Sequence, residues 1–538
     1  MSEPVLSIRG LTIALPKGAD RPYAVEDVSY DVARGEIMCV VGESGSGKSM
    51  AANALMGLLP KGVRPTAGEV IFDGQDLLTL TEKQHRKLRG LHIGMIFQEP
   101  MTALNPLMRV GAQIAEVFEA HGKYNGKERQ AHALALLEEV GIPQPDKAIR
   151  AYPFQLSGGQ RQRVMIAMAL ALEPKLLIAD EPTTALDVTT QAQILELIRD
   201  LQKRRGMSVM FITHDFGVVA EVANRVCVMR YGQIVELGPA EEVLENPQHE
   251  YTRALIEAIP SNIIPEARGG ERPAPLLEVK GLNKVFRSKG GLFKAAREVR
   301  ALDDVSFTLA PGETVGIVGE SGSGKSTLGR CVVRLERPDS GTLSLAGTDF
   351  TSLTGEALRR QRWRVQMIFQ DPYASLNPRT RVGYAIAQGP MANGVPREQA
   401  MKQAGELLDL VGLGAVAVDR FPHEFSGGQR QRIGIARALA LNPELIVADE
   451  AVSALDVSIQ AQILELLEDL KQKLSLSLLF ITHDLRVAAQ ICDYIIVMQH
   501  GRVVEQGTAE SVFLSPKEAY TRELLAAIPG RDQELATA

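Results

Sequence analysis

The chain has 538 residues, of which 45% are hydrophobic and 23% are charged, a composition typical of globular proteins with buried cores. Its length is enough for roughly two to four domains. The formal net charge of −6 and the pI of about 6.0 argue against a nucleic-acid-binding protein, because the basic surface of such proteins raises the pI well above neutral.

The amino-terminal end, MSEPVLSIRG, has no basic segment followed by an apolar one, so no secretory signal is expected. Apolar runs such as residues 475–482 are much shorter than the ~20 residues needed to span a bilayer. We therefore expect a soluble protein that reaches a membrane only through a partner. The cysteines are Cys39, Cys227, Cys331 and Cys492. They form no CxxC pair, and so they indicate a reducing cytoplasm and buried thiols rather than disulfides or a metal cluster.

The predicted elements occur twice along the chain, in the same order. Each half has an apolar run that ends in a glycine-rich loop, then a stretch with helical apolar spacing, then two short and continuous apolar runs. Continuous apolar runs are typical of strands covered on both faces of a sheet. In the first half these segments are residues 37–41, 129–140, 176–179 and 210–212, and in the second half 314–318, 397–411, 445–448 and 479–481. The pattern predicts an α/β core with a helical insertion, twice.

Sequence motifs confirm that the repeat is a duplication of whole domains. The recurring segments are VGESGSGKS (41–49 and 318–326), IFQ[ED]P (96–100 and 368–372), SGGQRQR (157–163 and 426–432) and ITHD (212–215 and 481–484). Between the halves, residues 261–275 are rich in proline, glycine and charge, which indicates a flexible linker. We therefore predict a first domain at residues 1–260, a linker at 261–275 and a second domain at 276–538.

The glycine-rich loops match GxxxxGK[ST], in which backbone N–H groups surround phosphate oxygens and a helix begins at the lysine. The lysine neutralises the β- and γ-phosphates of ATP, and the hydroxyl of Ser49 or Ser326 ligates Mg²⁺. A single match could be a glycine-rich turn before a helix, but two matches, each after an apolar run, make that alternative negligible. The predicted nucleotide-binding residues are Gly42, Glu43, Ser44, Gly45, Ser46, Gly47, Lys48, Ser49 and Met50, and Gly319, Glu320, Ser321, Gly322, Ser323, Gly324, Lys325, Ser326 and Thr327.

An acidic pair follows a predicted strand in each half, Asp180 with Glu181 and Asp449 with Glu450. At the carboxyl end of a parallel strand, such carboxylates lie beside the phosphate loop. The aspartate can hold Mg²⁺ through water, and the glutamate can act as the general base that polarises the attacking water. An acidic pair by itself is as often a solvated turn. Its place between SGGQ and ITHD in both halves favours the catalytic interpretation.

The order of phosphate loop, glutamine loop, SGGQ signature, acidic pair and histidine resembles the ABC-transporter ATPases. The resemblance covers nearly the whole chain, and LSGGQ at 156–160 and FSGGQ at 425–429, each followed by RQR, are highly specific. It implies an ATP hydrolase of two tandem P-loop domains. Each domain is expected to have a RecA-like α/β core, an antiparallel β subdomain and a helical subdomain.

In this family two cassettes pair head to tail, and each ATP lies between one phosphate loop and the signature of the other cassette. The resemblance implies the same pairing in this chain. The ATP at the first phosphate loop would be closed by Ser426, Gly427, Gly428 and Gln429, and the ATP at the second loop would be closed by Ser157, Gly158, Gly159 and Gln160. Gln98 and Gln370 would contact Mg²⁺ and the attacking water and report to a membrane partner. His214 and His483 would contact the γ-phosphate. Asp187 and Asp456 would communicate across the interface.

The family also stacks adenine on an aromatic residue just after the first strand. Phe286 fits this place in the second half, whereas the first half has Leu15 there, with Tyr23 nearby as a substitute. Stacking contributes about 1–3 kcal/mol per base in nucleic-acid complexes. The sequence therefore predicts weaker nucleotide binding at the first phosphate loop.

The glutamine loops and the tails at 246–260 and 515–529 resemble those of peptide/nickel-class importers. The resemblance implies the fused dual-ATPase subunit of a bacterial importer of oligopeptide, dipeptide, glutathione or microcin C type, peripheral on the cytoplasmic face of the inner membrane. The implied partners are two integral-membrane permeases and, through them, a periplasmic or extracellular substrate-binding protein. One copy per transporter and no nucleic acid are expected. Residues 259–275 contain no cysteine, so no iron–sulfur cluster is expected.

Two other classes of tandem-cassette ATPase are the alternatives. Ribosome-associated translation factors have a long charged helical linker, which the short Pro/Gly-rich segment at 261–275 does not resemble. DNA-repair ATPases carry zinc-binding cysteine sets and large insertions, and this sequence has neither. The importer subunit is thus the favoured function, and the ribosome-acting ATPase is the alternative.

Overall fold

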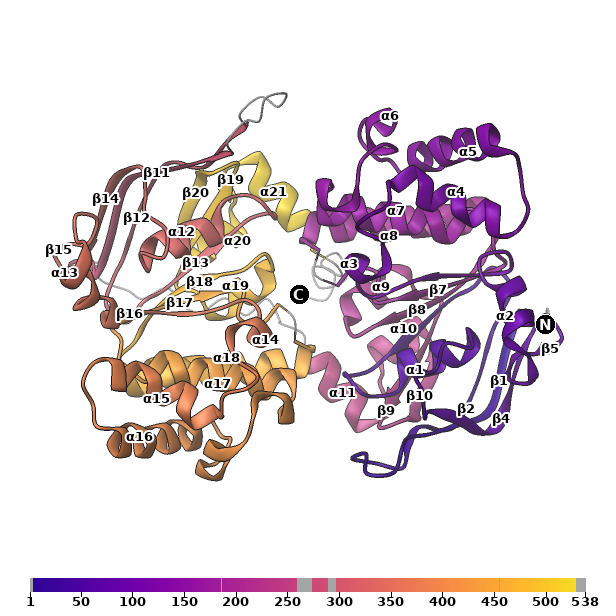
Figure 1. Cartoon of the computed structure of the whole chain (residues 1–538), viewed down its shortest axis with the longest axis horizontal. Helices are drawn as coiled ribbons and strands as arrows, with labels where there is room; N and C mark the ends of the chain where they lie inside the picture. Colours follow the sequence, from indigo (N-terminus) through magenta and orange to yellow (C-terminus); the bar gives the residue numbers. More distant parts are fainter. Residues whose placement is uncertain (1–2, 185, 259–272, 289–296, 454, 529–538) are drawn as a thin grey trace. The chain divides into compact units, whose positions relative to one another are not determined.

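The computed structural model describes residues 3–184, 186–258, 273–288, 297–453 and 455–528. They form two compact units (Figure 1). We name the cassettes by sequence, the first up to residue 258 and the second from residue 273, and each is described by itself. The predicted linker at 261–275 lies outside the described residues apart from 273–275. Within the described ranges, no helix is long and apolar enough to cross a membrane.

The first cassette contains one antiparallel sheet, in the order β2-β1-β4-β5, and one six-stranded sheet, in the order β10-β9-β3-β8-β7-β6. In the second sheet only β10 is antiparallel to its neighbour. The strands are β1 (Leu6–Ala14), β2 (Tyr23–Val32), β3 (Ile37–Val41), β4 (Arg64–Phe72), β5 (Gln75–Asp76), β6 (Ile93–Ile96), β7 (Leu176–Asp180), β8 (Ser208–Thr213), β9 (Arg225–Arg230) and β10 (Gln233–Pro239).

The helices of the first cassette gather mainly between β6 and β7 and after β7. They are α1 (Lys48–Leu55), α2 (Glu82–Leu88), α3 (Pro100–Ala103), α4 (Val110–Ala120), α5 (Gly126–Glu139), α6 (Pro145–Ala148), α7 (Gly158–Leu170), α8 (Val188–Arg205), α9 (Phe216–Val222), α10 (Ala240–Glu245) and α11 (Glu250–Glu257), with 3-10 turns η1 (Leu77–Thr79) and η2 (Pro153–Gln155). Helix α5 is the helical segment that the sequence predicts at residues 129–140, and α4, α5 and α6 lie between the glutamine loop and the signature, where the insertion is expected.

The second cassette repeats both sheets, in the orders β12-β11-β14-β15 and β16-β17-β18-β13-β19-β20. Its last strand, β20, is again antiparallel to its neighbour, and the other five are parallel. The strands are β11 (Leu277–Ser288), β12 (Arg297–Leu309), β13 (Thr314–Val318), β14 (Ser340–Leu345), β15 (Thr348–Asp349), β16 (Val365–Ile368), β17 (Leu445–Asp449), β18 (Ser477–Ile481), β19 (Tyr494–Gln499) and β20 (Arg502–Thr508).

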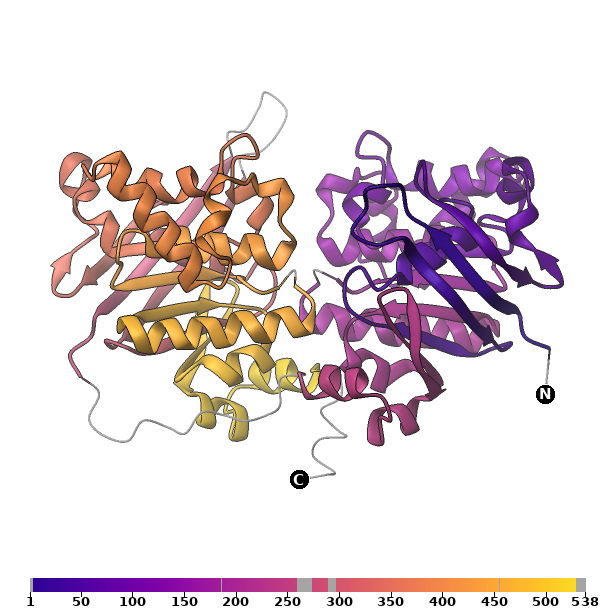
Figure 2. The ribbon, with the colours of Figure 1, turned by 90° about the horizontal axis from the view of Figure 1, so that it is seen from below.

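The helices of the second cassette follow the same plan. They are α12 (Lys325–Val332), α13 (Gly355–Arg359), α14 (Pro372–Ser375), α15 (Val382–Ala392), α16 (Arg397–Leu410), α17 (Gly427–Leu439), α18 (Val457–Leu474), α19 (Leu485–Ile491), α20 (Ala509–Leu514) and α21 (Ala519–Ala526), with 3-10 turns η3 (Arg362–Arg364), η4 (Ala415–Asp419) and η5 (Pro422–Glu424). The long helix α18 is seen from its side in orange-yellow in Figure 2.

The predicted fold class is confirmed, because each cassette has an α/β core, an antiparallel sheet and a helical part, and the core sheet lies between the other two in Figure 1. Strands β3 and β13 have the predicted bounds and are buried at every residue, as parallel strands covered on both faces should be. Strands β7 and β17 extend one residue further than predicted, so that the aspartate is the last residue of the strand. All four cysteines are free and buried, as expected.

Candidate functional site

Each phosphate loop follows a central strand and turns sharply at its first glycine. Gly42 has φ of 151°, and a side chain there would meet the carbonyl oxygen of Met229, since a Cβ atom would lie 2.2 Å from it. In the second cassette Gly319 has φ of 147° and the same 2.2 Å approach to the carbonyl of Met498. Only glycine fits this close contact between two backbones. The loop conformation is therefore set by the strand that lies beside it.

The lysine at the end of each loop points back into it. Lys48 is 4% exposed, and its ammonium donates to the carbonyl oxygens of Gly42 and Glu43, the latter at 2.9 Å. Lys325 donates to the carbonyls of Gly319 at 2.6 Å and of Glu320 at 2.8 Å, and burial lowers the pKa of this lysine. Both ammonium groups thus lie inside the ring of backbone that the sequence predicts to hold phosphates.

The first helical turn of each cassette faces the acidic pair. Ser49 donates to Asp180 at 2.9 Å in the first cassette, and Ser326 donates to Asp449 at 2.9 Å in the second. No described group of three or more His, Cys, Asp or Glu residues makes a metal cage. Mg²⁺ in nucleotide sites is held by one or two protein oxygens, substrate phosphates and waters. One hydroxyl and one carboxylate at hydrogen-bond distance therefore fit the ion.

Three loops of the first cassette bring their side chains to Glu181. Gln98 donates to the Glu181 carboxylate at 3.0 Å, and His214 Nδ1 lies 3.4 Å from the same oxygen, Oε2. Thr184 donates to this oxygen as well, at 2.9 Å. These residues follow β6, β7 and β8, which are neighbours in the parallel sheet. Their carboxyl ends meet at one edge, so residues far apart in sequence converge there.

The second cassette repeats this convergence around Glu450. Gln370 donates to its carboxylate at 2.6 Å, and His483 Nδ1 lies 3.5 Å from it. Glu181 and Glu450 also share an uncommon backbone conformation, with φ of 45° and 47°. A left-handed glutamate costs of order 1–3 kcal/mol and tends to occur at functional sites. Nothing in the sequence indicated this conformation.

The aspartate and the glutamate of each acidic pair have pKa values that are shifted in opposite directions. Burial raises the pKa of Asp180 to about 6, although the hydrogen bond from Ser49 opposes it. Burial acts in the same direction on Glu181, but the contact with His214 outweighs it and lowers the pKa to about 2. In the second cassette the pKa of Asp449 is again raised by burial, and that of Glu450 is lowered. The glutamate is therefore ionised at neutral pH, which is the form able to accept a proton, although the lowered pKa makes it a weaker base.

The signature serine and glutamine have a structural role of their own. Ser157 caps helix α7: its hydroxyl accepts from the Gln160 N–H at 3.3 Å, and the Gln160 side chain accepts from the Ser157 N–H at 3.1 Å. Ser426 and Gln429 form the same capping box on α17. This arrangement orients the first N–H groups of the helix toward solvent or a ligand.

The signature glycines permit close helix packing. A Cβ atom on Gly159 would lie 2.5 Å from the Thr190 side chain of α8, and one on Gly428 would lie 2.4 Å from the Ile459 side chain of α18. Asp187 and Asp456 come directly before these two long helices. The pairing of each signature with the opposite phosphate loop stays a prediction.

The two cassettes differ on the side of the phosphate loop away from the acidic pair. In the first cassette a cavity of about 400 Å³ is lined by Tyr23, by the phosphate loop and by Arg230 and Tyr231. Leu15 instead packs against the core. In the second cassette Phe286 is 41% exposed, with the Lys284 ammonium 5.3 Å from its ring centre. Tyr231 was not predicted, because an exposed tyrosine after a strand carries no motif.

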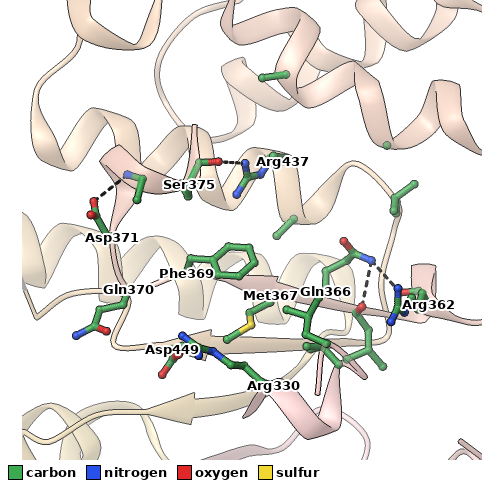
Figure 3. A pocket seen from close by; sticks show the side chains of 18 of the residues that line it. Arg330, Arg362, Gln366, Met367, Phe369, Gln370, Asp371, Ser375, Arg437 and Asp449 are labelled. Carbon is green, nitrogen blue, oxygen red and sulfur yellow. Dashed lines mark hydrogen bonds between the residues drawn. The ribbon is translucent and has the colours of Figure 1, made fainter. Parts of the chain in front are cut away.

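A second cavity, of about 690 Å³, lies beside Gln370 in the second cassette (Figure 3). Figure 3 shows Phe369 and Gln370 together on the loop after β16, with Arg437 of α17 above the phenylalanine. The Arg437 guanidinium lies 5.9 Å from the centre of the Phe369 ring, which is 38% exposed. Gln370 therefore contacts Glu450 of the acidic pair and also lines an open cavity with apolar and cationic side chains.

Two tyrosines outside every predicted site contact the phosphate loops. Tyr251 of α11 and Tyr520 of α21 each accept a hydrogen bond from a loop N–H, of Glu43 at 3.2 Å and of Glu320 at 3.1 Å. Both tyrosines lie in the repeated tails, EYTRAL and AYTREL. The tail sequences indicated the class of protein, but they did not predict this contact with the phosphate loop. The hydrogen-bond partner of a tyrosine hydroxyl depends on how its helix packs.

Comparison with protein families finds two matches that together cover most of the chain. The family described as "ABC transporter" matches residues 25–184 and 302–453, which contain both phosphate loops and both signatures. The family described as "Oligopeptide/dipeptide transporter, C-terminal region" matches residues 235–287 and 504–537, which contain both tails.

Individual relatives agree with these matches along the full length. The chain is 49% identical to the peptidoglycan transport ATP-binding protein YejF of Agrobacterium fabrum, over 98% of this chain and 96% of that protein. It is 46% identical to the glutathione import ATP-binding protein GsiA of Salmonella choleraesuis, over 99% of this chain and 90% of that protein. A solved dimeric bacterial ABC transporter cassette is 32% identical, covering 44% of this chain and 98% of that chain, with a TM-score of 0.40.

Proposed function

This chain belongs to the ABC transporter family, and from that premise we propose that it is the ATP-hydrolysing subunit of a bacterial importer for peptides or peptide-like substrates. The observation that supports the proposal is the convergence of glutamine, glutamate and histidine beside a phosphate loop, in both cassettes. The peptide class is supported by the family match of both tails. The relatives named for peptidoglycan transport and glutathione import support it further.

Each site has the groups that ATP hydrolysis needs. The loop N–H groups and Lys48 or Lys325 bind the phosphates, and Mg²⁺, when bound through Ser49 and Asp180 or their counterparts, neutralises charge on the transferred phosphoryl group. Glu181 or Glu450 accepts the proton of the attacking water. Gln98 or Gln370 holds that glutamate by a hydrogen bond and orients the water.

We further propose that the two ATP sites are composite. The capped helices α7 and α17 each present a serine and two glycine N–H groups at a positive helix end, which suits a γ-phosphate. The sequence-based domain bounds, 1–260 and 276–538 with a linker between, suit a single chain that supplies both halves of both sites.

The partner is proposed to be a pair of membrane permeases, with the chain on the cytoplasmic face of the membrane. The cavity beside Gln370 supports this, because a partner segment inserted there would contact the same loop that touches Glu450. Exposed Phe369 and nearby Arg437 suit a segment with apolar and acidic side chains. Closure and reopening of the cassettes would then move the permeases through this loop.

Affinity purification of the tagged chain from membranes of its host tests the proposal. Two integral-membrane proteins are expected at one copy each with the chain, and Phe369→Asp is expected to lose them while ATP binding persists. Exposed Trp363 provides the matched control, because Trp363→Ala removes an aromatic group of the same cassette that does not line the cavity. Stable association with ribosomes instead of membrane proteins would overturn the proposal.

A further inference from the structure

The tails of both cassettes end in a helix that touches the phosphate loop of the same cassette. In the first cassette, the Tyr251 hydroxyl accepts from the Glu43 N–H at 3.2 Å and also bonds the Glu43 side chain. In the second, the Tyr520 hydroxyl accepts from the Glu320 N–H at 3.1 Å. The same contact occurs in both cassettes, whose phosphate loops are identical and whose tails share the residues YTR, so it is a common feature of the repeat.

The tyrosine side of the contact is buried, since Tyr251 is 7% exposed and Tyr520 is 8% exposed, whereas the loop residues that donate are partly buried. A shielded N–H without a partner is destabilising, so the hydroxyl satisfies a donor of the loop. Burial raises the pKa of both phenols, that of Tyr520 to about 12. Both phenols therefore stay neutral at any physiological pH and can accept and donate at once.

The peptide that donates to the tyrosine is held at its other end as well. Its carbonyl oxygen, which belongs to Gly42 or Gly319, accepts from the ammonium of Lys48 or Lys325, in the second cassette at 2.6 Å. The same lysines also donate to the next carbonyls, of Glu43 at 2.9 Å and of Glu320 at 2.8 Å. The second residue of each loop is thus fixed between a tyrosine of the tail and the lysine that binds phosphate. When the lysine turns toward a nucleotide, the tyrosine remains as the side-chain anchor of this peptide.

The helices that carry the tyrosines are themselves anchored. The Glu236 carboxylate of β10 accepts from the N–H groups of Gln248 at 2.8 Å and His249 at 3.2 Å, just before α11. The Glu505 carboxylate of β20 does the same for Lys517 at 2.8 Å and Glu518 at 3.2 Å, before α21. A hydroxyl on a helix tied to the sheet edge is placed more accurately than one on a free loop.

We propose that Tyr251 and Tyr520 are positioning residues that hold the phosphate loops in the shape that binds nucleotide, so that the carboxyl-terminal helix of each cassette sets the affinity of its own ATP site. The inference rests on the proposed function, in which these loops bind ATP. It gives the tails, which mark the peptide-importer class, a direct part in ATP binding.

The test measures each site separately with a fluorescent N-methylanthraniloyl ATP and Mg²⁺. Lys325→Ala isolates the first loop, and Tyr251→Phe is added to it; Lys48→Ala isolates the second loop, and Tyr520→Phe is added to that. Loss of one hydrogen bond is expected to weaken binding about threefold to tenfold at the site concerned. The KM for ATP should rise by a similar factor, with little change in kcat, because the reacting groups are untouched.

The controls remove a phenol hydroxyl elsewhere in the same cassette, Tyr124→Phe for the first site and Tyr384→Phe for the second; both tyrosines are exposed. A second probe is inorganic tripolyphosphate, whose binding should weaken by the same factor as that of ATP, because the lost contact is at the phosphate loop. Unchanged affinity in Tyr251→Phe and Tyr520→Phe, or a fall in kcat alone, would overturn the inference while leaving the proposed function standing. If the parent chain bound neither probe, the proposed function itself would fail.

Discussion

The first and second cassettes agree closely at the phosphate end of the nucleotide site and differ at the other end. The serine hydroxyl lies 2.9 Å from the aspartate carboxylate in both, and a glutamine and a histidine lie beside each of Glu181 and Glu450. Beyond the loop, the first cassette has tyrosines and an arginine around a cavity, whereas the second has an exposed phenylalanine. Phosphate chemistry demands fixed geometry. Stacking on a base tolerates many arrangements, because every base has a π-face.

A smaller difference lies beside the two glutamates that we propose as general bases. Thr184 donates to the Glu181 carboxylate at 2.9 Å, whereas its counterpart Ser453 donates to the backbone carbonyl of Glu450 at 3.0 Å. Glu181 therefore has one more side-chain hydrogen bond than Glu450. The comparison predicts similar but unequal sites.

The largest effect is expected from removal of both bases. Glu181→Gln together with Glu450→Gln should lower ATP hydrolysis by roughly 10²- to 10⁴-fold, because general-base catalysis contributes about that much. Binding of ATP should persist, since the phosphate loops are unchanged. Steady-state phosphate release and equilibrium binding measure the two quantities, and each single variant shows whether both cassettes turn over. Normal turnover in the double variant would mean that the bases are assigned wrongly.

The next largest effect is expected from the loop lysines. Lys48→Ala or Lys325→Ala should weaken nucleotide binding at its own loop by roughly tenfold to a hundredfold, because a hydrogen bond to a charged group contributes about 1.5–3 kcal/mol. The two losses should be alike, since both ammonium groups make the same contacts. Calorimetric titration with ATP gives both affinities. A loss of affinity at only one loop would show that the two phosphate loops do not bind nucleotide in the same way.

The adenine end should distinguish the cassettes. With the opposite lysine replaced, Phe286→Leu is expected to weaken ATP binding at the second loop about tenfold, because stacking contributes about 1–3 kcal/mol. Tyr23→Leu should weaken binding at the first loop less, because Tyr231 lines the same cavity. The parent first site should bind ATP more weakly than the parent second site. Equal parent affinities would remove the proposed difference.

The smallest effect concerns the hydroxyls beside the bases. Thr184→Ser and Ser453→Thr exchange the two residues, and each is expected to change kcat by about twofold to threefold at its own site, because the hydroxyl is kept and only its acceptor beside the ionised glutamate changes. Rates are measured with the opposite glutamate changed to glutamine. Exposed Ser352, far along the chain from the acidic pairs, gives the control Ser352→Thr. Identical rates throughout would mean that this contact does not tune the base.

Most of the fold was predictable because its signals are local. Continuous apolar runs predicted the bounds of β3 and β13 to the residue, and helical spacing found α5 within three residues and α16 within one. The four-stranded antiparallel sheet and its place beside the core followed only from the family resemblance. The left-handed backbone of Glu181 and Glu450 had no sequence signal, because it is imposed by the surrounding structure.

The sequence by itself determined the chemistry of this protein. A phosphate loop is one continuous segment whose own backbone binds the ligand, and the family motifs named the residues that serve it. Only the tertiary structure decided which side chains meet. Gln98 reaches Glu181 across 83 residues because their strands are neighbours, and Tyr251 reaches Glu43 across 208 residues because a helix packs against the sheet edge. Hydrogen-bond partners depend on distances in space, which spacing along a chain does not contain.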